Sequence, residues 1–149
     1  MFNEGDIAPD FELTDDSGNQ VKLSKLLETG PVLLYFYPAD FTPVCTKQAC
    51  MFRDIYANMR AAGVHVLGVS PQDPASHARF RKEHALPFPL LADPDKSVIR
   101  IYGANGPLGI GVRRVSYLIA PDRTIQQVVL ADFRVSKHEE LAQSATRRS

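Results

Sequence analysis

The stretch FYPADFTPVCTKQAC, residues Phe36–Cys50, joins an apolar run to a helix start and contains both cysteines of the chain. The run Val32–Tyr37 is continuously apolar and lies between two prolines, which is typical of a buried strand. Thr42 followed by Pro43 is a strong helix-start signal, because a hydroxyl residue favours the N-cap and proline favours the first helical position. A strand that leads into a helix in this way predicts an α/β unit, with Cys45 at the third helical position.

Outward from this unit, strand patterns and helix patterns follow each other along the chain. We expect an N-terminal β-hairpin turned at Asp15–Gly18 and then a short helix capped by Ser24. From the central unit onward we expect helices at Thr42–Arg60 and from about Asp73, strands at Gly63–Ser70 and in FPLLAD, and a short helix closed by Gly103. The chain should end in a hairpin turned at Pro121–Asp122 and a terminal helix opened by a Ser136/Glu139 capping box. This order predicts an α/β sandwich with a mixed central sheet flanked by helices. Active sites in such sheets lie beyond the carboxyl ends of central strands, where the stretch Phe36–Cys50 falls.

Length and composition predict one domain, residues 1–149, with a frayed tail from about residue 140. Seventeen basic residues balance seventeen acidic ones, so we expect binding neither to nucleic acid nor to an anionic membrane. No apolar run approaches the ~20 residues that span a bilayer, and the N-terminus does not resemble a signal peptide. We therefore expect a cytoplasmic protein, in a compartment where a purely structural disulfide is unusual.

We expect neither a metal nor a cofactor. The four histidines are scattered and none is close to a cysteine in sequence: His65, His77, His84 and His138. A zinc site needs a second cluster of closely spaced ligands, which the chain lacks. The glycine-rich stretch GANGPLGIG, residues 103–111, lacks the lysine of a phosphate-binding loop and does not run from a strand into a helix, so a flexible loop is expected there.

Two interpretations of Cys45 stay open at this level. A helix N-terminus favours an anion through its unpaired N–H groups and its dipole, and thiols at such positions ionise more easily. Cys45 would then be a reactive thiolate. On a helical wheel, however, Cys45 falls on the apolar stripe that also holds Phe52 and Met59, so it could equally be a small buried core residue.

Cys50 lies on the opposite face of the same expected helix, which is not where a core cysteine belongs. Five residues of α-helix separate Cα atoms by about 8.6 Å, whereas a disulfide needs roughly 4.4–6.8 Å. A bond between Cys45 and Cys50 would therefore require the first turns of the helix to unwind.

The stretch YPADFTPVCTKQACMFRD resembles the active-site signature of the peroxiredoxins, P-x-x-x-T-x-x-C, with Pro38, Thr42 and Cys45 in register. The position of Cys50, five residues after Cys45, resembles the Q-type branch (the bacterioferritin-comigratory-protein group) of the alkyl hydroperoxide reductase/thiol-specific antioxidant family. The resemblance continues through GDIAPDFEL, VLGVS, PFPLLAD and RVSYLI. It implies a thioredoxin-like fold over most of the chain.

The resemblance also implies an enzyme, a thiol peroxidase that reduces hydrogen peroxide and organic hydroperoxides. Cys45 would attack the hydroperoxide and become a sulfenic acid. Thr42 and the Cys45 amide would hold the peroxide oxygens, and Pro38 would shield the site from water. Arg114, in the sequence RRVSYL, would stabilise the thiolate and the transition state, with Arg113 as the alternative because register in a double arginine is easily misread.

Cys50 would then form an intramolecular disulfide with the sulfenic acid after local unfolding, and thioredoxin or a glutaredoxin-like dithiol would reduce it. The same branch implies a monomer or a weak homodimer. Many Q-type sequences carry Glu where this chain has Gln48, so a negative charge that could tune Cys45 or Arg114 is absent.

Three other functions stay open. The protein could be a peroxidase that uses Cys45 alone, with Cys50 incidental. It could be a thioredoxin-like disulfide reductase, although the chain has no C-x-x-C motif. It could also be a peroxide sensor that passes its oxidation to a partner protein.

Overall fold

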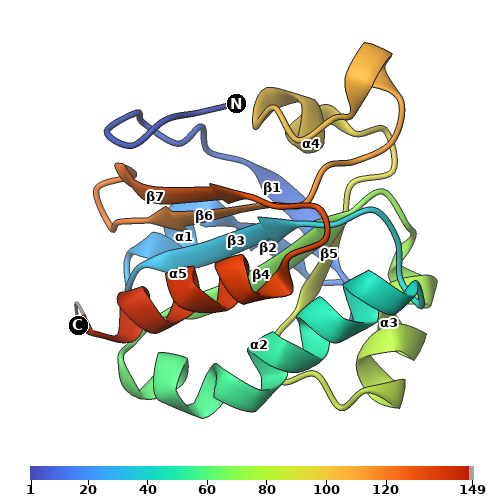
Figure 1. Ribbon diagram of the computed structural model, residues 1–149, viewed down its shortest axis with the longest axis horizontal. Helices are drawn as coiled ribbons and strands as arrows, with labels where there is room; N and C mark the ends of the chain where they lie inside the picture. Colours follow the sequence, from blue (N-terminus) through green and yellow to red (C-terminus); the bar gives the residue numbers. More distant parts are fainter. Residues whose placement is uncertain (148–149) are drawn as a thin grey trace.

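The computed structural model describes residues 1–147 as a seven-stranded sheet with helices on both faces (Figure 1). The strands are β1 (Glu12–Asp15), β2 (Gln20–Lys22), β3 (Val32–Phe36), β4 (His65–Ser70), β5 (Leu90–Ala92), β6 (Val115–Ile119) and β7 (Ile125–Leu130). The helices are α1 (Leu23–Leu27), α2 (Pro43–Ala61), α3 (Pro74–Glu83), α4 (Ser97–Ile101), α5 (Val135–Arg147) and the 3-10 helix η1 (Pro107–Gly109).

The strand order in the sheet is β2-β1-β5-β4-β3-β6-β7. β4 runs parallel to its neighbours β3 and β5, whereas β6 runs antiparallel to β3 and β7. β1 and β2 form the expected N-terminal hairpin, and β1 extends the sheet beside β5. The prediction of a mixed central sheet flanked by helices is confirmed.

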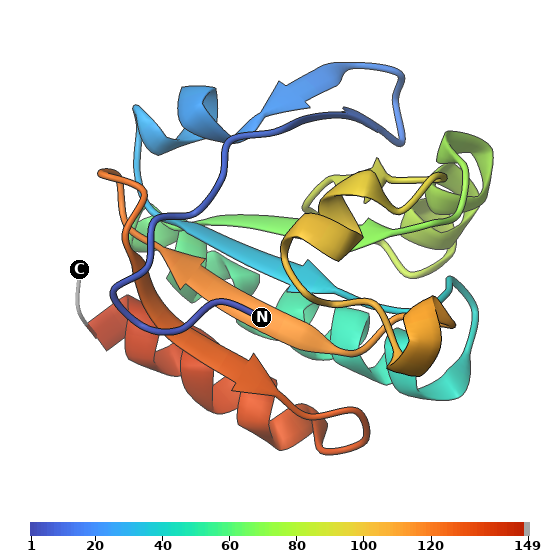
Figure 2. The same ribbon diagram turned by 90° about the horizontal axis from the view of Figure 1, so that it is seen from above.

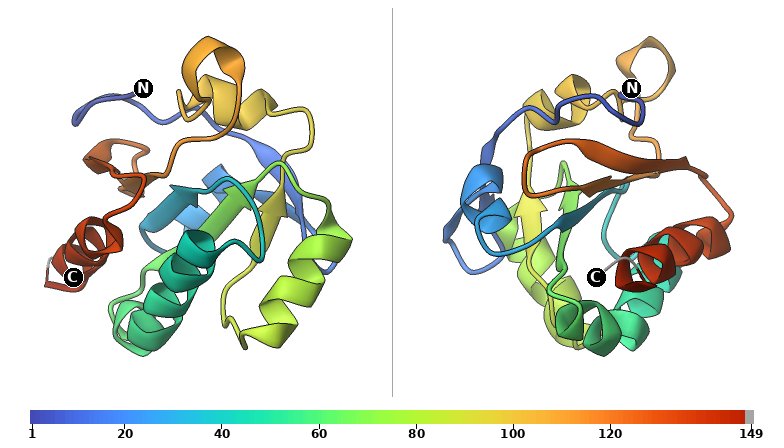
Figure 3. Two further views of the ribbon diagram at one scale, coloured as in Figure 1. Left: turned by 45° about the vertical axis from the view of Figure 1, so that its right-hand side comes forward. Right: turned by 90° about the vertical axis from the view of Figure 1, so that its left-hand side faces the viewer.

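The interior strand β3 supplies both faces of the sheet with core residues, because successive side chains point to opposite sides. Leu34 and Phe36 pack in the cluster that contains the residues of α1 and α4. Leu33 and Tyr35 pack in the second cluster, with α2, α3 and α5. Figure 3 shows these two helical layers on opposite sides of the sheet.

β3 leads the chain to the end of the molecule where the expected site lies. The loop after β3, the start of α2 and η1 all lie at this end when the molecule is viewed from above (Figure 2). The expected loop at residues 103–111 is irregular, and it contains η1. No helix among the described residues is both long enough and apolar enough to cross a bilayer.

Three local predictions are wrong. Ser24 does not cap α1: it is the second helical residue, and its amide and hydroxyl both donate to the carboxylate of Asp10, at 2.9 and 2.8 Å. Ser136 is likewise inside α5, which begins one residue earlier. The tail expected to fray from about residue 140 is helical as far as Arg147, because Leu141 is buried in the same core cluster as the apolar residues of α2. Residues 148–149 lie outside the described part of the chain.

Candidate active site

The start of α2 follows the sequence prediction, with Thr42 at the N-cap and Pro43 at the first helical position. The hydroxyl of Thr42 does not cap the helix, because it donates instead to the carbonyl of Ala39 at 3.0 Å. The first backbone bond of the helix runs from the Thr46 amide to the Thr42 carbonyl, at 2.8 Å. Within residues 1–147, no hydrogen bond occupies the amide of Cys45, so this N–H stays available to an anion.

Cys45 combines the two interpretations left open by the sequence. Its side chain is only 2% exposed and belongs to the core cluster of α2, α3 and α5. Its Sγ nevertheless lies 3.1 Å from Nη1 of Arg114, a residue that is itself 5% exposed. The guanidinium places a positive charge and a hydrogen-bond donor directly against the sulfur. Cys45 is therefore both a core residue and a residue whose sulfur contacts a cation.

Arg114 is held by several other contacts, which fix its guanidinium against Cys45. Nη1 also donates to Oε1 of Gln48 at 2.9 Å, and Nε donates to the backbone carbonyl of Asp132 at 2.9 Å. The Arg114 amide donates to Oδ1 of Asp132 at 3.0 Å. Arg113 faces the other way, and its guanidinium donates twice to Oδ2 of Asp132, at 2.9 and 2.7 Å. Of the two arginines, Arg114 contacts the thiol.

Asp132 connects both arginines and was missed by the sequence reasoning. Partial burial raises the pKa of this carboxyl, but hydrogen bonds from the Arg113 side chain and the Arg114 amide outweigh that effect and hold the pKa below its ordinary value. Nothing in the sequence marks Asp132, since its partners lie 18 and 19 residues earlier and meet it only through the pairing of β6 with β7.

Gln48 is the second polar residue in contact with Arg114, and it is fully buried. Arginine can only donate hydrogen bonds, so the contact fixes Oε1 of Gln48 toward the guanidinium and turns Nε2 away. Nε2 is buried and has no hydrogen-bond partner among the described residues. The sequence did contain a signal for this residue, because Gln48 follows Cys45 by three positions and so shares its helix face.

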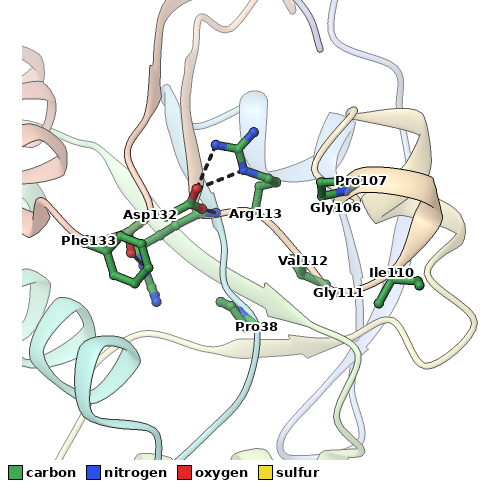
Figure 4. A pocket seen from close by; sticks show the side chains of 10 residues that line it. Pro38, Gly106, Pro107, Ile110, Gly111, Val112, Arg113, Asp132 and Phe133 are labelled. Atoms are coloured by element: carbon green, nitrogen blue, oxygen red, sulfur yellow. Dashed lines mark hydrogen bonds and ion pairs between the residues drawn. The ribbon is translucent and has the colours of Figure 1, made fainter.

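Pro38 lies on the wall of a pocket of about 450 Å³ at this end of the molecule, and Arg114 lines the same pocket. Figure 4 shows Pro38 below the Arg113–Asp132 ion pair, with residues 106–112 on one side and Phe133 on the other. Much of the rim is apolar: the side chains of Ile110 and Phe133 are 74% and 83% exposed. The pocket therefore borders the residue whose guanidinium contacts Cys45.

The loop between β3 and α2 is attached to α3 by a buried polar cluster. Oδ2 of Asp40 lies 2.7 Å from Nδ1 of His77, and the Tyr37 hydroxyl donates to Oδ1 of Asp40 at 2.6 Å. Nε2 of His77 donates to the carbonyl of Leu91, 3.0 Å away. Burial raises the pKa of Asp40, but the hydrogen bond and charge of His77 outweigh it and lower the pKa overall. These contacts fix the segment that carries Pro38 and Thr42.

Cys50 lies on the far side of α2, half-buried, with Nδ1 of His84 3.9 Å from its Sγ. Both cysteines are free, and α2 is continuous through both positions. In this conformation they do not bond, as the helix geometry predicts. Among residues 1–147, no group of His, Cys, Asp and Glu side chains is arranged to hold a metal ion.

Comparison with known proteins fits this geometry. Residues 5–128 match the sequence model of the AhpC/TSA family. The chain belongs to the AhpC/TSA family. The chloroplastic peroxiredoxin Q of Arabidopsis thaliana is 43% identical over 137 residues, which are 91% of this chain and 63% of that protein. The corresponding protein of Oryza sativa subsp. japonica is 42% identical with the same coverage, so the chain spans less than two thirds of the length of these curated relatives.

Two solved structures are similar to this protein over nearly the whole chain. Peroxidoxin BcpB from Mycobacterium tuberculosis has a TM-score of 0.92 and 35% sequence identity, over 99% of this chain and 98% of that one. The bacterioferritin comigratory protein of Xanthomonas campestris has a TM-score of 0.84 and 26% identity, over 93% and 90% of the two chains. The thioredoxin-like fold and the resemblance to the Q-type branch are thereby confirmed.

Proposed function

We propose that this protein is a thiol peroxidase that reduces hydrogen peroxide and organic hydroperoxides with Cys45 as the attacking thiolate. The observation that carries the proposal is the contact of 3.1 Å between Arg114 and the buried Cys45 sulfur at the start of α2. The proposal is further supported by the relatives, which are named as peroxiredoxins, and by the alkyl peroxide reduction ascribed to the Xanthomonas campestris protein.

In the first step the Cys45 thiolate attacks the terminal oxygen of the hydroperoxide. The O–O bond breaks, Cys45 becomes a sulfenic acid, and the leaving alkoxide or hydroxide takes up a proton to leave as alcohol or water. Arg114 offsets the negative charge that spreads over the sulfur and both oxygens in the transition state. The free Cys45 amide can donate to the same oxygens. Thr42 donates its own proton to Ala39, so its hydroxyl oxygen can accept from the hydroperoxide O–H.

In the second step Cys50 displaces the hydroxyl of the sulfenic acid and forms an intramolecular disulfide, after the first turns of α2 have unwound. A dithiol protein such as thioredoxin or a glutaredoxin-like reductant then restores both thiols. We propose a monomer or a weak homodimer, which sedimentation can test. We also propose the cytoplasm as the compartment. The plant relatives are named as chloroplastic, and fractionation of the source cells decides for this chain.

Hydroperoxide consumption with thioredoxin as the reductant tests the proposal directly. Wild type should consume peroxide, Cys45→Ser should lose this activity entirely, and Cys50→Ser should lose it with thioredoxin while its Cys45 is still oxidised. Full activity in Cys45→Ser contradicts the proposal.

Intact mass after one equivalent of peroxide tests the resolving role of Cys50. Loss of two hydrogens supports the Cys45–Cys50 disulfide, whereas gain of one oxygen without that loss shows a peroxidase that uses Cys45 alone. Rapid oxidation of Cys45 combined with slow turnover by every dithiol offered would instead favour a peroxide sensor.

A further inference from the structure

Cys50 faces an imidazole that no motif in the sequence predicts. Nδ1 of His84, 34 residues away in sequence, lies 3.9 Å from Sγ of Cys50. This separation is long for a hydrogen bond, but catalytic contacts are often long in the resting state and shorten during reaction. Cys50 and His84 are both half-buried, so the pair lies at the boundary between α2, the end of α3 and solvent.

His84 is held in this position by two contacts that do not involve Cys50. Its carbonyl accepts a hydrogen bond from Nη1 of Arg53 at 2.9 Å, which joins the end of α3 to α2. Its ring packs edge-on against Phe80, with the ring centroids 5.1 Å apart. Arg53 lies beyond Cys50 along α2, so unwinding of the helix from its start reaches Cys50 before it reaches this attachment.

The hydrogen-bond pattern leaves one His84 nitrogen free to accept a proton. Among the described residues, the His84 ring has no side-chain or backbone hydrogen bond other than the contact of Nδ1 with Cys50. The ring is partly exposed, so water can solvate an Nε2–H group. The neutral ring then presents the lone pair of Nδ1 to the thiol, which is the arrangement required of a base.

We propose that His84 is a catalytic base for Cys50, a role that rests on the proposed function of Cys50 as the resolving thiol. An ordinary thiol is only about 3% ionised at pH 7, and the thiolate is the form that attacks sulfur. Cys45 lies at a helix N-terminus with the guanidinium of Arg114 donating to its sulfur, whereas Cys50 is the eighth residue of α2 and, among the described residues, no guanidinium donates to its sulfur. In this proposal His84 removes the proton of the Cys50 thiol, because no helix N-terminus is present at Cys50 to favour the thiolate.

The proton balance of the resolving step closes through His84. Nδ1 takes the proton of the Cys50 thiol, giving a thiolate beside an imidazolium. The thiolate attacks the Cys45 sulfenic sulfur, the S–S bond forms, the S–O bond breaks, and hydroxide leaves. The imidazolium returns the proton, directly or through water, so that the products are the disulfide, one water molecule and neutral His84.

Other charged groups lie near Cys50. Lys47 and Asp54 of α2 and Glu139 of α5 line the same groove of about 420 Å³ as Cys50, and the charge of Arg53 on α2 also interacts with Cys50. Carboxylates, ammonium groups and guanidinium groups ordinarily keep their charge between pH 6 and 8, whereas histidine changes its charge there. A pH dependence of Cys50 reactivity in that range can therefore be assigned to His84 by substitution.

Alkylation of Cys50 tests the proposal without any peroxide chemistry. In the Cys45→Ser background Cys50 is the only thiol, so the rate of its reaction with iodoacetamide, followed by intact mass from pH 6 to 9, reports its thiolate. His84→Asn should lower the rate at pH 7 at least threefold and restore the pH profile of a simple thiol. A change smaller than threefold overturns the proposal. His84→Gln serves as a second variant, and circular dichroism verifies that both fold.

His65→Asn is the matched control, because this histidine is also partly buried but contacts Thr29 instead of a cysteine. It should leave the alkylation rate unchanged. With both cysteines present, His84→Asn should slow the conversion of sulfenic acid to disulfide at least threefold while leaving the oxidation of Cys45 unchanged. If peroxide fails to oxidise Cys45 in wild type, the proposed function is wrong, and the alkylation rates still decide whether His84 acts on Cys50.

Discussion

His77 and His138 are both fully buried, and each supports one of the two segments that meet at Cys45. His77 lies on α3 and holds Asp40, in the loop that carries Pro38 and Thr42. His138 lies on α5 and donates from Nε2 to the carbonyl of Ala131 at 2.9 Å, next to the Asp132 that positions Arg114. One histidine thus supports the loop that carries Pro38 and Thr42, and the other supports the segment that positions Arg114.

Both histidines contact a backbone carbonyl at Nε2, but they differ in the partner of Nδ1. His77 faces a carboxylate at Nδ1 and a carbonyl at Nε2, which are both hydrogen-bond acceptors when Asp40 is ionised. His138 faces the Ser116 hydroxyl at Nδ1, 2.7 Å away, and a hydroxyl can donate to a neutral ring. Burial lowers the pKa of His138, and the nearby charge of Arg114 lowers it further.

This difference has a consequence for pH dependence. The lowered pKa of His138 favours its neutral form, which avoids a second positive charge near the Arg114 guanidinium. The charged cluster around Asp40 supports its loop at any pH where the carboxylate is ionised. The Asp40–His77 contact and the His138 contact should therefore lose their stabilising effect at different pH values. Substitutions on the two sides should also have different effects.

The largest effect is expected from Asp40→Asn, which leaves the buried His77 without its carboxylate. Removing the charge of a buried carboxylate that bonds to Tyr37, Ser76 and His77 should lower the free energy of unfolding by about 3–5 kcal/mol, measured by urea denaturation at pH 7. Asp54→Asn is the control, because this carboxylate pairs with Arg53 at the surface and should cost no more than about 1 kcal/mol. A loss below about 1 kcal/mol in Asp40→Asn would show that the cluster does not hold the loop.

The next effect is expected on the other side of the site, from Arg114→Lys. Lysine cannot reproduce a planar group that contacts Cys45, Gln48 and the Asp132 carbonyl at once. The rate constant for oxidation of Cys45 by peroxide should fall about 100- to 1,000-fold, measured by rapid quench and mass spectrometry. Arg113→Lys should stay within a few-fold of wild type, and equal losses in the two variants would contradict the assignment of Arg114.

The third prediction separates the two histidines by pH. His138 has a lowered pKa in the folded state, so below about pH 6.5 the unfolded chain binds a proton that the folded chain does not. Stability should therefore fall as the pH is lowered from 7 to 5.5, with a slope of up to about 1.4 kcal/mol per pH unit from this residue. The lowered pKa of Asp40 gives the same sign of dependence, but only below about pH 4.

Urea denaturation at pH 7 and pH 5.5 measures this slope, which should be smaller in His138→Gln than in wild type. His65 also has a pKa lowered by burial, so His65→Asn is measured in parallel to subtract its contribution. An unchanged slope in His138→Gln would mean that His138 does not carry a proton difference between the folded and unfolded states.

The sequence predicted the parts of the site that depend on local chain geometry. The helix start at Thr42–Pro43 placed Cys45 at an N-terminus, and the helical wheel placed Cys50 on the opposite face. The sheet could also be predicted, because buried strands have a clear apolar pattern. The caps at Ser24 and Ser136 were wrong, since tertiary contacts with Asp10 and the core decided those boundaries.

The remaining residues could not be predicted, because their contacts join distant parts of the chain. Asp132 reaches Arg114 across a hairpin, and His77 reaches Asp40 from α3. His84 reaches Cys50 only because the end of α3 packs against the middle of α2. No periodicity or motif in a single sequence predicts these residue contacts, since each contact depends on how the helices and strands pack together.

The smallest effect is expected from Gln48→Glu, which adds a carboxylate beside Arg114, on the same side of the site as His138. The new carboxylate would pair with Nη1 of Arg114, and it would also place a second negative charge beside the Cys45 thiolate. These effects oppose each other, so oxidation of Cys45 at pH 7 should slow by less than about tenfold, the equivalent of 1.36 kcal/mol. Gln143→Glu, at an exposed position of α5, should leave the rate unchanged. A faster reaction in Gln48→Glu would mean that the position of Arg114, rather than the charge around Cys45, limits the rate of oxidation.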